Sequence, residues 1–420
     1  MRVLIVSAVY PPEPVISAQT SAQVAQSLAS SGCEVTVVTS FPNRPGGTVF
    51  PGFSRRLVHR QLLSPDIQIV RCFSTLSPES RISSRLLENL SFGLISAWQV
   101  LTVRRPDVIY ANTWPIVATG ILFLVASVRH ISLVVSVQDI YPEALVVQNR
   151  IAPQSILARL LRWIDGVIAR HSAHVIVISE RFAEIYRGQR RVPAERLSLI
   201  PNWIDSNQID IGVTGEKYRQ GLGLDAHNFL LVYGGNVGVA AGVETLVEAM
   251  HLLTDEQSAR LLIAGAGSQL ARCQQLAAAM PDQRVFFHTP WAAEDTSAVL
   301  RAADLLILPT RSEQSLVSAP SKLLTYMLSG RPILATATPG SDLAETVHHA
   351  QCGWVVEPDR PDLLADKVKE IMQLDPAERQ RRGDNGRVYV LQHYAKEICV
   401  PHIIHRTYAS TIVTVGDLNC

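Results

Sequence analysis

The sequence predicts an α/β protein of two doubly wound domains that face a central cleft. Short apolar runs typical of strands alternate with helical patterns along the chain, and this alternation favours parallel sheets covered by helices. The alternation comes in two sets, separated by a polar stretch with four glycines at residues 206–228. With 420 residues, of which 47% are hydrophobic, the chain is too long for one ordinary core and suits two domains of about 200 residues.

The first set of elements, over residues 1–205, begins with a βαβ unit. A strand at 2–8 is followed by a helix at 17–31 with alanines on one face, and Gly32 ends that helix before a strand at 34–40. Further strand candidates lie at 67–71, 107–112, 132–139, 174–179 and 197–202. Helical stretches separate most of them, so we expect one parallel sheet in this domain.

The second set, over residues 229–380, follows a linker at 206–228. Its strand candidates are 229–236, 259–267, 284–289, 304–310, 332–337 and 353–358. The pattern from Ala377 to Ser410 is helical, and we assign 381–420 to C-terminal helices. Because parallel strands bring their carboxyl ends to one edge of a sheet, we expect ligands to bind at that edge.

One stretch of the second set has the features of a phosphate site. An apolar strand at Leu305–Pro309 is followed by a polar loop and by a helix at Ala319–Ser329, whose first turn holds a proline and Ser321. The free N–H groups and positive dipole end of that helix, with Lys322 in its first turn, would attract phosphate. The alternative is an ordinary strand-loop-helix crossover with a solvated lysine.

Glycines follow two strands of the second domain. Gly234 and Gly235 end one strand, and Gly265 and Gly267 end the next, so that backbone N–H groups can approach a phosphate closely. The spacing is neither G-x-G-x-x-G nor a P-loop, which argues against a nicotinamide cofactor or a Walker-type ATPase. His288 ends the third strand, where it would suit the edge of a nucleobase. The alternatives are plain turns and a structural histidine.

Charge is divided unequally between the two halves of the chain. Residues 1–205 hold 20 Lys+Arg against 13 Asp+Glu, a net charge of +7, whereas residues 206–420 hold 18 against 24, a net of −6. All 20 cations of the first half are arginine, which suits phosphate or anionic headgroups. The alternative is a merely solvated basic face.

Cysteines and apolar runs bear on metal content and location. The six cysteines are scattered without a CxxC or Cys/His cluster, which argues for reduced thiols, no structural metal and a cytoplasmic protein. Prolines follow the short apolar run at Val3–Ser7, so we expect no signal peptide. The longest nearly apolar run, Trp114–Val128, would span roughly 22 Å as a helix and is too short to cross a membrane.

Several motifs together resemble those of family 4 glycosyltransferases of the GT-B fold. They are YPPEP (10–14), the strand at Gly32–Thr39, VQDIYPEAL (137–145), IPNWID (200–205), YGGNVG (233–238), AGAG (264–267) and PSKLLTYMLSGRP (320–332). VQDIYPE and PSKLLTYM are specific signals, whereas the glycine-rich pieces alone are weak. The chain is most similar to the bacterial branch that builds surface polysaccharides, including colanic-acid-type and fucosaminyl transferases.

The resemblance implies transfer of a sugar from a nucleotide diphosphate donor, with retention of anomeric configuration and no bound metal or other cofactor. The sequence contains no Asp-x-Asp pair. In such a reaction, amides, helix N-termini and cations meet the charge on the leaving diphosphate. We therefore expect Gly234, Gly235, Ser321 and Lys322 at the diphosphate, with Arg311 as a second cation. His288 and the Gly265–Gly267 turn are expected near the base; uridine is the first choice, with guanosine left open.

The chain departs from the family pattern at several donor-site positions. The second Glu of the usual E-x7-E pair, which holds the donor ribose, is Thr325 here. The Arg and Lys that usually follow the first glycine pair of the second domain are Asn236 and Ala241. These changes suit a subfamily, and they equally suit a catalytically silent nucleotide-binding protein. A nucleotide-sugar epimerase is a further alternative.

The acceptor side is expected on the first domain. Asp139 ends a strand and Glu143 follows four residues later, so either carboxylate would serve as the base that receives the acceptor proton. Alternatively, Asp139 caps a helix that starts at Tyr141 or Pro142. Ser17, Asn112 and Trp114 are the expected acceptor-binding residues. The alternative for Trp114 is core packing.

Two amphipathic stretches suggest contact with a lipid surface. Residues 81–105 and 155–171 combine arginines with apolar and aromatic side chains, a pattern that suits the interface of an anionic membrane. The alternative is ordinary amphipathic core helices. Combined with the resemblance, these stretches predict a polyprenyl-diphosphate-linked acceptor and peripheral contact with the cytoplasmic membrane face. We expect no nucleic acid as a partner. By the same resemblance, the C-terminal helices are expected to cross back to the first domain.

Overall fold

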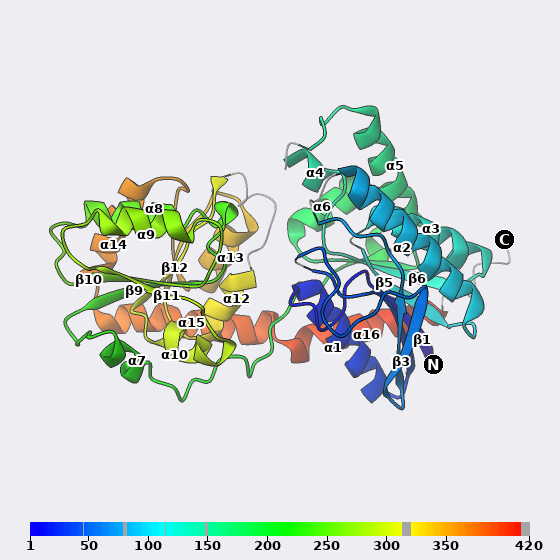
Figure 1. The fold of residues 1–420 in the computed structure, drawn as a ribbon, viewed down its shortest axis with the longest axis horizontal. Helices are drawn as coiled ribbons and strands as arrows, with labels where there is room; N and C mark the ends of the chain where they lie inside the picture. The colour runs from blue at the N-terminus through cyan, green and yellow to red at the C-terminus, as the bar shows by residue number, and fades with distance from the viewer. Residues whose placement is uncertain (45, 79–81, 114, 148–149, 313–320, 413–420) are drawn as a thin grey trace. The chain divides into compact units, whose positions relative to one another are not determined.

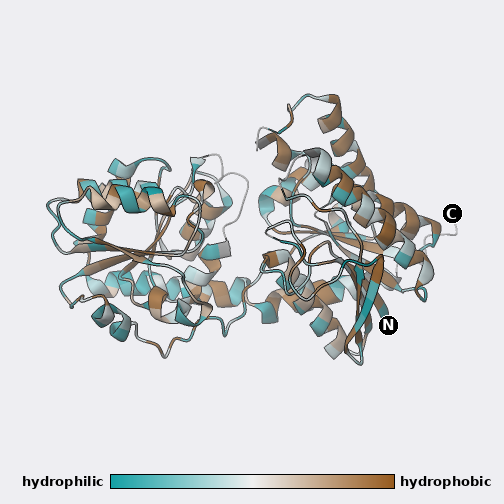
Figure 2. Ribbon diagram, viewed as in Figure 1, coloured by the Kyte–Doolittle hydropathy of each residue, from teal (hydrophilic) through white to brown (hydrophobic). Residues whose placement is uncertain are grey.

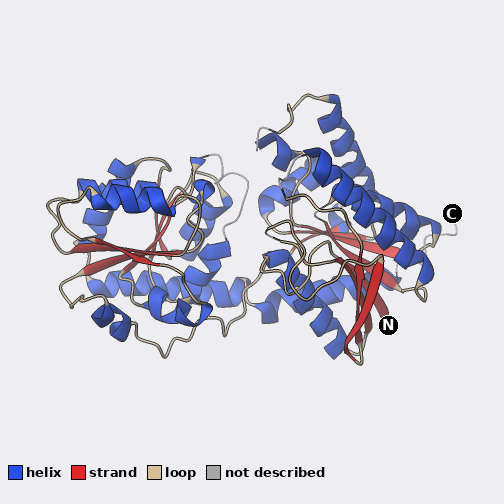
Figure 3. Cartoon of the chain, viewed as in Figure 1, coloured by secondary structure: helices blue, strands red, loops and turns tan. Residues whose placement is uncertain are grey.

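The computed structural model describes residues 1–44, 46–78, 82–113, 115–147, 150–312 and 321–412. The chain forms two compact units (Figure 1): unit 1 comprises Met1–Asn202 and the chain from Cys399 onward, and unit 2 comprises Trp203–Ile398. Each unit is a mainly parallel sheet with helices on both faces (Figure 3), so the expected α/β class with doubly wound sheets is confirmed.

Unit 1 is built on a sheet in which every described pair of neighbouring strands is parallel except β3 and β4. The spatial order is β3 (Val58–Ser64), β4 (Ile67–Cys72), β2 (Glu34–Ser40), β1 (Arg2–Val6), β5 (Val108–Thr113), β6 (Ser132–Val137), β7 (His174–Val177) and β8 (Leu197–Leu199). The chain order reverses direction between β1 and β5, which makes the carboxyl ends of these two strands the switch point of the unit.

The helices of unit 1 cover this sheet and share its core. They are α1 (Ile16–Ser30), α2 (Ile82–Thr102), α3 (Ile116–Val128), α4 (Glu143–Val147), α5 (Ile156–His171), α6 (Glu180–Gly188), the 3-10 turn η1 (Ala194–Arg196) and α16 (Lys396–Ile412). Two begin with a serine cap: Ser155 accepts from the N–H of Ala158 and Ser179 from that of Phe182. In α16, Tyr408 Oη shares a 2.9 Å hydrogen bond with Cys33 Sγ, which ties the C-terminal helix to unit 1.

Unit 2 has a wholly parallel sheet over the described strands. Its spatial order is β11 (Val285–His288), β10 (Ala259–Ala264), β9 (Phe229–Gly234), β12 (Leu305–Leu308), β13 (Ile333–Thr336) and β14 (Gly353–Val356). The switch point lies between β9 and β12. Both strands are buried along their whole length, as expected of central strands in a sheet covered on both faces.

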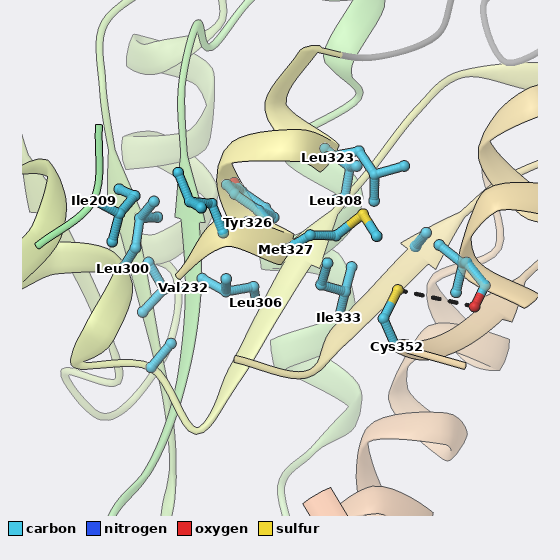
Figure 4. Close-up of a cluster of buried hydrophobic side chains, with 14 of the residues drawn as sticks. Ile209, Val232, Leu300, Leu306, Leu308, Leu323, Tyr326, Met327, Ile333 and Cys352 are labelled. Atoms are coloured by element: carbon cyan, nitrogen blue, oxygen red, sulfur yellow. Dashed lines mark hydrogen bonds between the residues drawn. The ribbon is translucent and has the colours of Figure 1, made fainter. Parts of the chain in front are cut away.

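The helices of unit 2 lie on both faces of the sheet. They are α7 (Glu216–Gly221), η2 (Val239–Ala241), α8 (Glu244–Leu252), α9 (Leu270–Ala278), η3 (Ala293–Asp295), α10 (Thr296–Arg301), α12 (Ser321–Leu328), α13 (Asp342–Ala350), α14 (Pro361–Met372) and α15 (Pro376–His393). In Figure 2 the strands of unit 2 are mostly brown, the colour of hydrophobic residues. In Figure 4, Leu323, Tyr326 and Met327 of α12 pack with sheet residues such as Leu306 and Ile333, so the sheet fixes α12 firmly.

The segment expected as an interdomain linker, residues 206–228, packs within unit 2. Ile209 and Leu224 join its hydrophobic core, and Arg219 pairs with Asp304 at 2.8 Å. Its polar composition and glycines are typical of a linker. The contacts of Ile209, Arg219 and Leu224 are widely spaced, so they leave no periodic pattern that would reveal packing from the sequence. The expected helix at Ala319–Ser329 is α12, which begins at Ser321. Ala319 and Pro320, which come just before Ser321, lie outside the described residues.

Residues Ile116–Val128 of the longest apolar run form α3. Among the helices described, none is both long and apolar enough to cross a bilayer. The strand β3 was not expected from the sequence, because Leu62 and Leu63 are both exposed at this sheet edge and no buried face imposes a periodic pattern.

Candidate functional site

The switch point of unit 2 brings glycines and a lysine into contact. Gly235 follows β9, and a Cβ atom added there would lie 2.1 Å from Cε of Lys322, so only glycine leaves room for this lysine side chain. Gly265 follows β10, and a Cβ atom there would lie 1.9 Å from the carbonyl oxygen of Gly235. The two glycines therefore allow the loops after β9 and β10 to pack against each other beside the lysine.

Lys322 is a largely buried cation without an acidic partner among the described residues. Its Nζ donates to Tyr233 Oη at 2.9 Å and lies 5.1 Å from the centre of that ring. Burial lowers the pKa of Lys322, since the charged amine has lost water and gained no carboxylate. An anion bound here would restore the missing charge partner, which makes this amine a candidate ligand-binding group.

Tyr326 fixes the position of α12 relative to the strand end. Its hydroxyl accepts from the N–H of Gly234 at 2.7 Å and donates to the carbonyl oxygen of the same residue at 3.1 Å. Because Tyr326 lies four residues after Lys322 on α12, the same helix that carries the amine is tied to β9. Sequence analysis missed this role, since a tyrosine on the apolar side of a helix looks like ordinary core.

Trp291 is a second residue of this site that the sequence did not reveal. Its indole ring lies against the end of β9, where a Cβ atom on Gly234 would be 2.8 Å from Cη2 of the ring. The indole nitrogen is buried and has no hydrogen-bond partner among the described residues. Gly234 thus allows an aromatic side chain to close one side of the switch point.

Arg311, expected as a second cation for the diphosphate, is already paired with two carboxylates. Its guanidinium donates to Asp359 at 2.6 Å and to Glu244, the first residue of α8. The hydrogen bond from Arg311 is among the causes that hold the pKa of Asp359 below its ordinary value. The structure therefore places Arg311 in a network that joins the loop after β12 to α8, and leaves Lys322 as the better candidate for the phosphate.

His288, expected near the nucleobase, has both ring nitrogens close to protein groups. Nδ1 is 2.6 Å from Tyr218 Oη and Nε2 is 3.5 Å from Asp295. The imidazole also stacks on the Tyr218 ring at an interplanar angle of 14°. These contacts favour the structural alternative, in which His288 joins α7 to the end of β11.

The remaining expected donor residues lie around the same strand ends. Gly267 adjoins the loop after β9, because a Cβ atom there would lie 2.3 Å from the carbonyl oxygen of Val237. The added Cβ atom on Gly267 would also lie 2.8 Å from the side-chain oxygen of Asn236, so Asn236 lies beside Gly267 where the two loops meet. Ser321 is the first residue of α12, and Thr325 lies one turn further along and is half-buried.

In unit 1, the two expected catalytic carboxylates differ in their surroundings. Both oxygens of Glu143 face arginines: Oε2 accepts from Arg190 at 2.7 Å, and Oε1 is 3.4 Å from Arg162. Arg190 is buried and also binds Asp165, whose partner is Tyr186. Glu143 therefore belongs to an ion-pair network, in which guanidinium groups already occupy its carboxylate.

Asp139 follows β6 and makes no hydrogen bond to the described residues. More than a third of the residue is exposed, yet it lines a small concavity with Tyr141 and Asp165, and this partial loss of water raises its pKa. The exposure keeps that rise moderate. Helix α4 begins at Glu143, and no capping hydrogen bond from Asp139 to the described helix is present, which argues against the capping alternative.

The switch point of unit 1 holds a neutral network of hydroxyl and amide groups. Asn112 Nδ2, at the end of β5, donates to Ser21 Oγ at 3.1 Å, and Ser21 donates to Ser7 Oγ at 3.1 Å after β1. Asn112 Nδ2 also lies 3.5 Å from the carbonyl oxygen of Ser17. Of the expected acceptor residues, Ser17 and Asn112 are thus close together, whereas Trp114 lies outside the described residues.

The YPPEP segment has a structural role next to this switch point. Glu13 is buried and accepts hydrogen bonds from the N–H groups of Tyr10, Asn43 and Arg44. Arg71 donates to the carbonyl oxygen of Pro11 at 2.7 Å. These contacts join the loop after β1 to the loop after β2 and to the strand β4. The proline-rich motif is therefore a scaffold for the carboxyl edge of the sheet.

Comparison with known proteins places both units in one enzyme class. Residues 17–203 match the family described as "Glycosyl transferase 4-like domain", and residues 228–374 match "Glycosyl transferases group 1". The probable glycosyltransferase WbjE of Pseudomonas aeruginosa is 25% identical over 329 residues, which cover 75% of this chain and 78% of the relative. The putative colanic acid biosynthesis glycosyl transferase WcaI of Escherichia coli is 23% identical over 388 residues, or 89% of this chain and 93% of the relative.

A solved structure supports the same assignment at the level of fold. HepE of Anabaena, crystallised in complex with UDP, superposes with a TM-score of 0.71 at 16% identity and covers 97% of this chain and 100% of that chain. Each half of the present chain is thus matched by a glycosyltransferase domain, and the whole has the corresponding architecture of two Rossmann-like units. The chain belongs to the family 4 glycosyltransferases of the GT-B fold.

Proposed function

We propose that this enzyme transfers a sugar from a nucleotide diphosphate sugar to a lipid-linked saccharide in polysaccharide or exopolysaccharide biosynthesis. Transfer is expected to retain anomeric configuration and to need no bound metal, as the family resemblance implies. The similarity to WcaI, whose name refers to colanic acid biosynthesis, supports the choice of pathway class. Uridine diphosphate is the first leaving group to test, because HepE was solved with UDP.

The observation that carries this proposal is the environment of Lys322. A partly buried amine that has no carboxylate partner among the described residues, at the switch point of a parallel sheet, is suited to an anionic ligand. Gly235 keeps that amine within reach of the strand end, and Tyr326 fixes the helix that carries it. The proposed ligand group is the diphosphate of the donor.

The main catalytic requirement of this reaction is stabilisation of the departing diphosphate. As the bond from the anomeric carbon to the diphosphate oxygen breaks, negative charge grows on that oxygen. Lys322 and the first N–H groups of α12 are the proposed groups that meet this charge. The N–H of Gly235 is not among them, because it donates to the carbonyl oxygen of Ala264 at 2.8 Å. A preorganised cation in a partly dry site stabilises the transition state more than the same cation in water.

The acceptor hydroxyl needs a group that takes its proton, and we assign this role to Asp139. Its carboxylate has no hydrogen-bond partner among the described residues, and its raised pKa makes it a stronger base than an ordinary aspartate. Glu143 is not retained as a candidate, because arginines face both of its oxygens. The neutral groups of Ser17 and Asn112 are the proposed acceptor-binding neighbours.

The proposal is tested by binding and turnover with matched variants. Thermal shift with UDP, GDP, ADP and CMP should show the largest stabilisation with UDP, since a ligand that binds only the folded state raises its melting temperature. Lys322→Ala should abolish most of that shift. Lys369→Ala, which removes a lysine in the last turn of α14, is the control and should respond as the wild type does.

Turnover separates the enzyme from a silent binding protein. Incubation with a labelled UDP-sugar and a membrane extract should transfer label into the lipid fraction, and Lys322→Ala should reduce this transfer. Binding of UDP without any transfer, or conversion of the sugar in the absence of acceptor, would contradict the transferase proposal. Unchanged kinetics for Lys322→Ala would remove the lysine from the donor site.

A further inference from the structure

Tyr233, the last residue but one of β9, is a core tyrosine whose hydroxyl reaches past the end of the strand. The residue is fully buried and belongs to the same hydrophobic cluster as Val237, Leu246 and Leu261. A phenylalanine would give this cluster the same apolar ring. The hydroxyl therefore adds nothing to the packing, and its role lies in the two hydrogen bonds that it makes.

The direction of both hydrogen bonds is fixed by the chemistry of the groups. Tyr233 Oη donates its single proton to the carbonyl oxygen of Asn236 at 2.6 Å, since a carbonyl oxygen can only accept. The ammonium of Lys322 can only donate, and its Nζ lies 2.9 Å from the same hydroxyl. The charged amine, the hydroxyl and the backbone carbonyl thus form a chain of hydrogen bonds with one possible direction.

Gly235 directs the side chain of Lys322 to this hydroxyl. A Cβ atom added to Gly235 would lie 2.1 Å from Cε, 2.9 Å from Cδ and 3.0 Å from Nζ of the lysine, so the outer part of the side chain lies against the glycine backbone. The lysine itself starts from the first turn of α12, which Tyr326 ties to β9. Helix, glycine and hydroxyl therefore fix the beginning, the middle and the tip of one side chain.

Tyr233 orients the amine without neutralising it. An ammonium group has three N–H donors, and the hydrogen bond to Tyr233 uses one of them. Within the part of the chain that the structure describes, the other two have no acceptor. A carboxylate in place of the hydroxyl would pair with the charge and weaken its attraction for a ligand. The neutral oxygen leaves both the charge and two donors of Lys322 to an anion.

The titratable groups around Tyr233 do not compete for this cation. They are Cys273 on α9 and Tyr326 on α12, in addition to Lys322 itself. Burial raises the pKa of Cys273 to about 11, and it raises the pKa values of Tyr233 and Tyr326 above that of an ordinary tyrosine. These three groups are therefore neutral at neutral pH, and none of them is an anion that would pair with Lys322 in place of a ligand.

We propose that Tyr233 is a positioning residue of the donor site, whose hydroxyl holds the amine of Lys322 where the diphosphate of the sugar donor binds. This inference rests on the proposed function and deepens it, because it identifies the group that keeps the cation in place. Tyr233 touches neither substrate and acts through Lys322. A side chain that is already held loses less conformational freedom on binding, and a preorganised cation stabilises the growing charge of the leaving group more effectively.

Tyr233→Phe tests this role, because it removes one oxygen and keeps the ring. UDP should bind about tenfold more weakly, since the amine loses its only described hydrogen bond, and kcat for sugar transfer should fall about tenfold as well. Tyr389→Phe is the matched control, because it removes the hydroxyl of a half-buried tyrosine on α15. This variant should match the wild type in UDP titration and turnover. Unchanged UDP affinity and kcat in Tyr233→Phe would overturn the inference.

A double-mutant cycle distinguishes positioning from a general loss of structure. Lys322→Met removes the charge and keeps an unbranched apolar side chain. If Tyr233 acts through Lys322, adding Tyr233→Phe to Lys322→Met should change the Kd for UDP by less than about twofold. A tenfold effect that persists without the lysine would overturn the inference, because Tyr233 would then support the site by packing or through the loop at Asn236.

The pKa of Lys322 is a readout that a purely structural role of Tyr233 would not move. The chain has five lysines, so NMR of protein with isotope-labelled lysine gives few signals, and the one absent from Lys322→Met belongs to Lys322. A hydroxyl that accepts from the ammonium favours its charged form. Tyr233→Phe should therefore lower the pKa of Lys322, and the Kd for UDP should begin to rise at a lower pH. An equal or higher pKa in the variant would overturn the inference.

These results also separate the inference from the proposed function. Absence of UDP binding by the wild type would overturn the proposed function and, with it, this role of Tyr233. UDP binding that Lys322→Met loses and Tyr233→Phe retains would overturn the role of Tyr233 alone and leave the donor site standing.

Discussion

The two units present chemically different groups at equivalent places in their sheets. At the switch point of unit 2, glycines bring backbone close to Lys322, a cation with no acidic partner among the described residues. At the switch point of unit 1, Ser7, Ser21 and Asn112 form a network of neutral hydrogen-bonding groups. The same architecture thus offers a positive site in one unit and a neutral polar site in the other.

This difference matches what the two proposed substrates require. A departing diphosphate needs positive charge and N–H donors, whereas a saccharide acceptor needs neutral donors and acceptors for its hydroxyl groups. The carboxylate of Asp139, which has no hydrogen-bond partner within the described part of the chain, adds a base to unit 1 and would repel a diphosphate. If the two substrates divide between the units in this way, substitutions in unit 1 will affect the acceptor and substitutions in unit 2 will affect the donor.

The largest expected effect is that of Asp139→Asn. Loss of the proposed base should lower kcat by about 10² to 10⁴-fold and leave UDP affinity unchanged, because donor groups lie in unit 2. The wild-type rate should fall as pH drops through the raised pKa of Asp139, since protonation removes the base, and this acidic decline should occur above the pH expected for an ordinary aspartate. Rate against pH, with UDP titrations, measures both.

Glu143→Gln is the matched control for that prediction. It should destabilise unit 1, because Arg190 loses a charged partner in a buried network, but kcat should stay within a few-fold of the wild type. If Glu143→Gln abolishes turnover in a folded protein while Asp139→Asn does not, the two carboxylates have been assigned the wrong way round.

Gly265→Ala should disturb the donor site through packing. A methyl group would meet the carbonyl oxygen of Gly235 at 1.9 Å, so the loops after β9 and β10 must separate. Overpacking of this kind costs about 1–3 kcal/mol of stability and should also weaken UDP. Thermal unfolding and UDP titration measure the two effects.

Gly223→Ala is the control for loss of a positive-φ glycine alone, because nothing lies within 4 Å of the added methyl group. Equal losses in both variants would contradict the proposed close contact.

The pH dependence of UDP binding should show a smaller effect. Burial lowers the pKa of Lys322, so the free enzyme loses this charge at a pH below the 10.5 of an ordinary lysine. Bound diphosphate favours the charged amine, so binding takes up a proton and the Kd for UDP rises as pH rises. Lys322→Arg should bind UDP with a Kd that rises only at higher pH. Identical pH profiles for the two proteins would exclude Lys322 as the titrating group.

Much of the fold was predictable because buried parallel strands leave continuous apolar runs. Such runs predicted the strands β9 and β12. The glycines after β9 and Lys322 at the start of α12 were singled out by their position after a strand, and their role in binding the donor stays a prediction. The partners of Arg311 were not, because Glu244 lies 67 residues away and Asp359 lies 48 residues away in the sequence. Likewise, nothing in the sequence shows that Nδ1 of His288 lies within hydrogen-bonding distance of Tyr218, which is 70 residues away. A sequence shows which side chains can bind a ligand, but not which of them already bind one another.

The smallest expected effect is that of Asn112→Ala at the switch point of unit 1. The variant loses the 3.1 Å hydrogen bond to Ser21 and should be about 1 kcal/mol less stable. Asn112 also holds Ser21 and the carbonyl oxygen of Ser17 in place at the proposed acceptor edge, so its loss should raise the KM for acceptor a few-fold. UDP affinity should not change. A variant that instead weakens UDP would show that the two switch points do not divide donor and acceptor, and Asn112 would then belong with Lys322 at the donor.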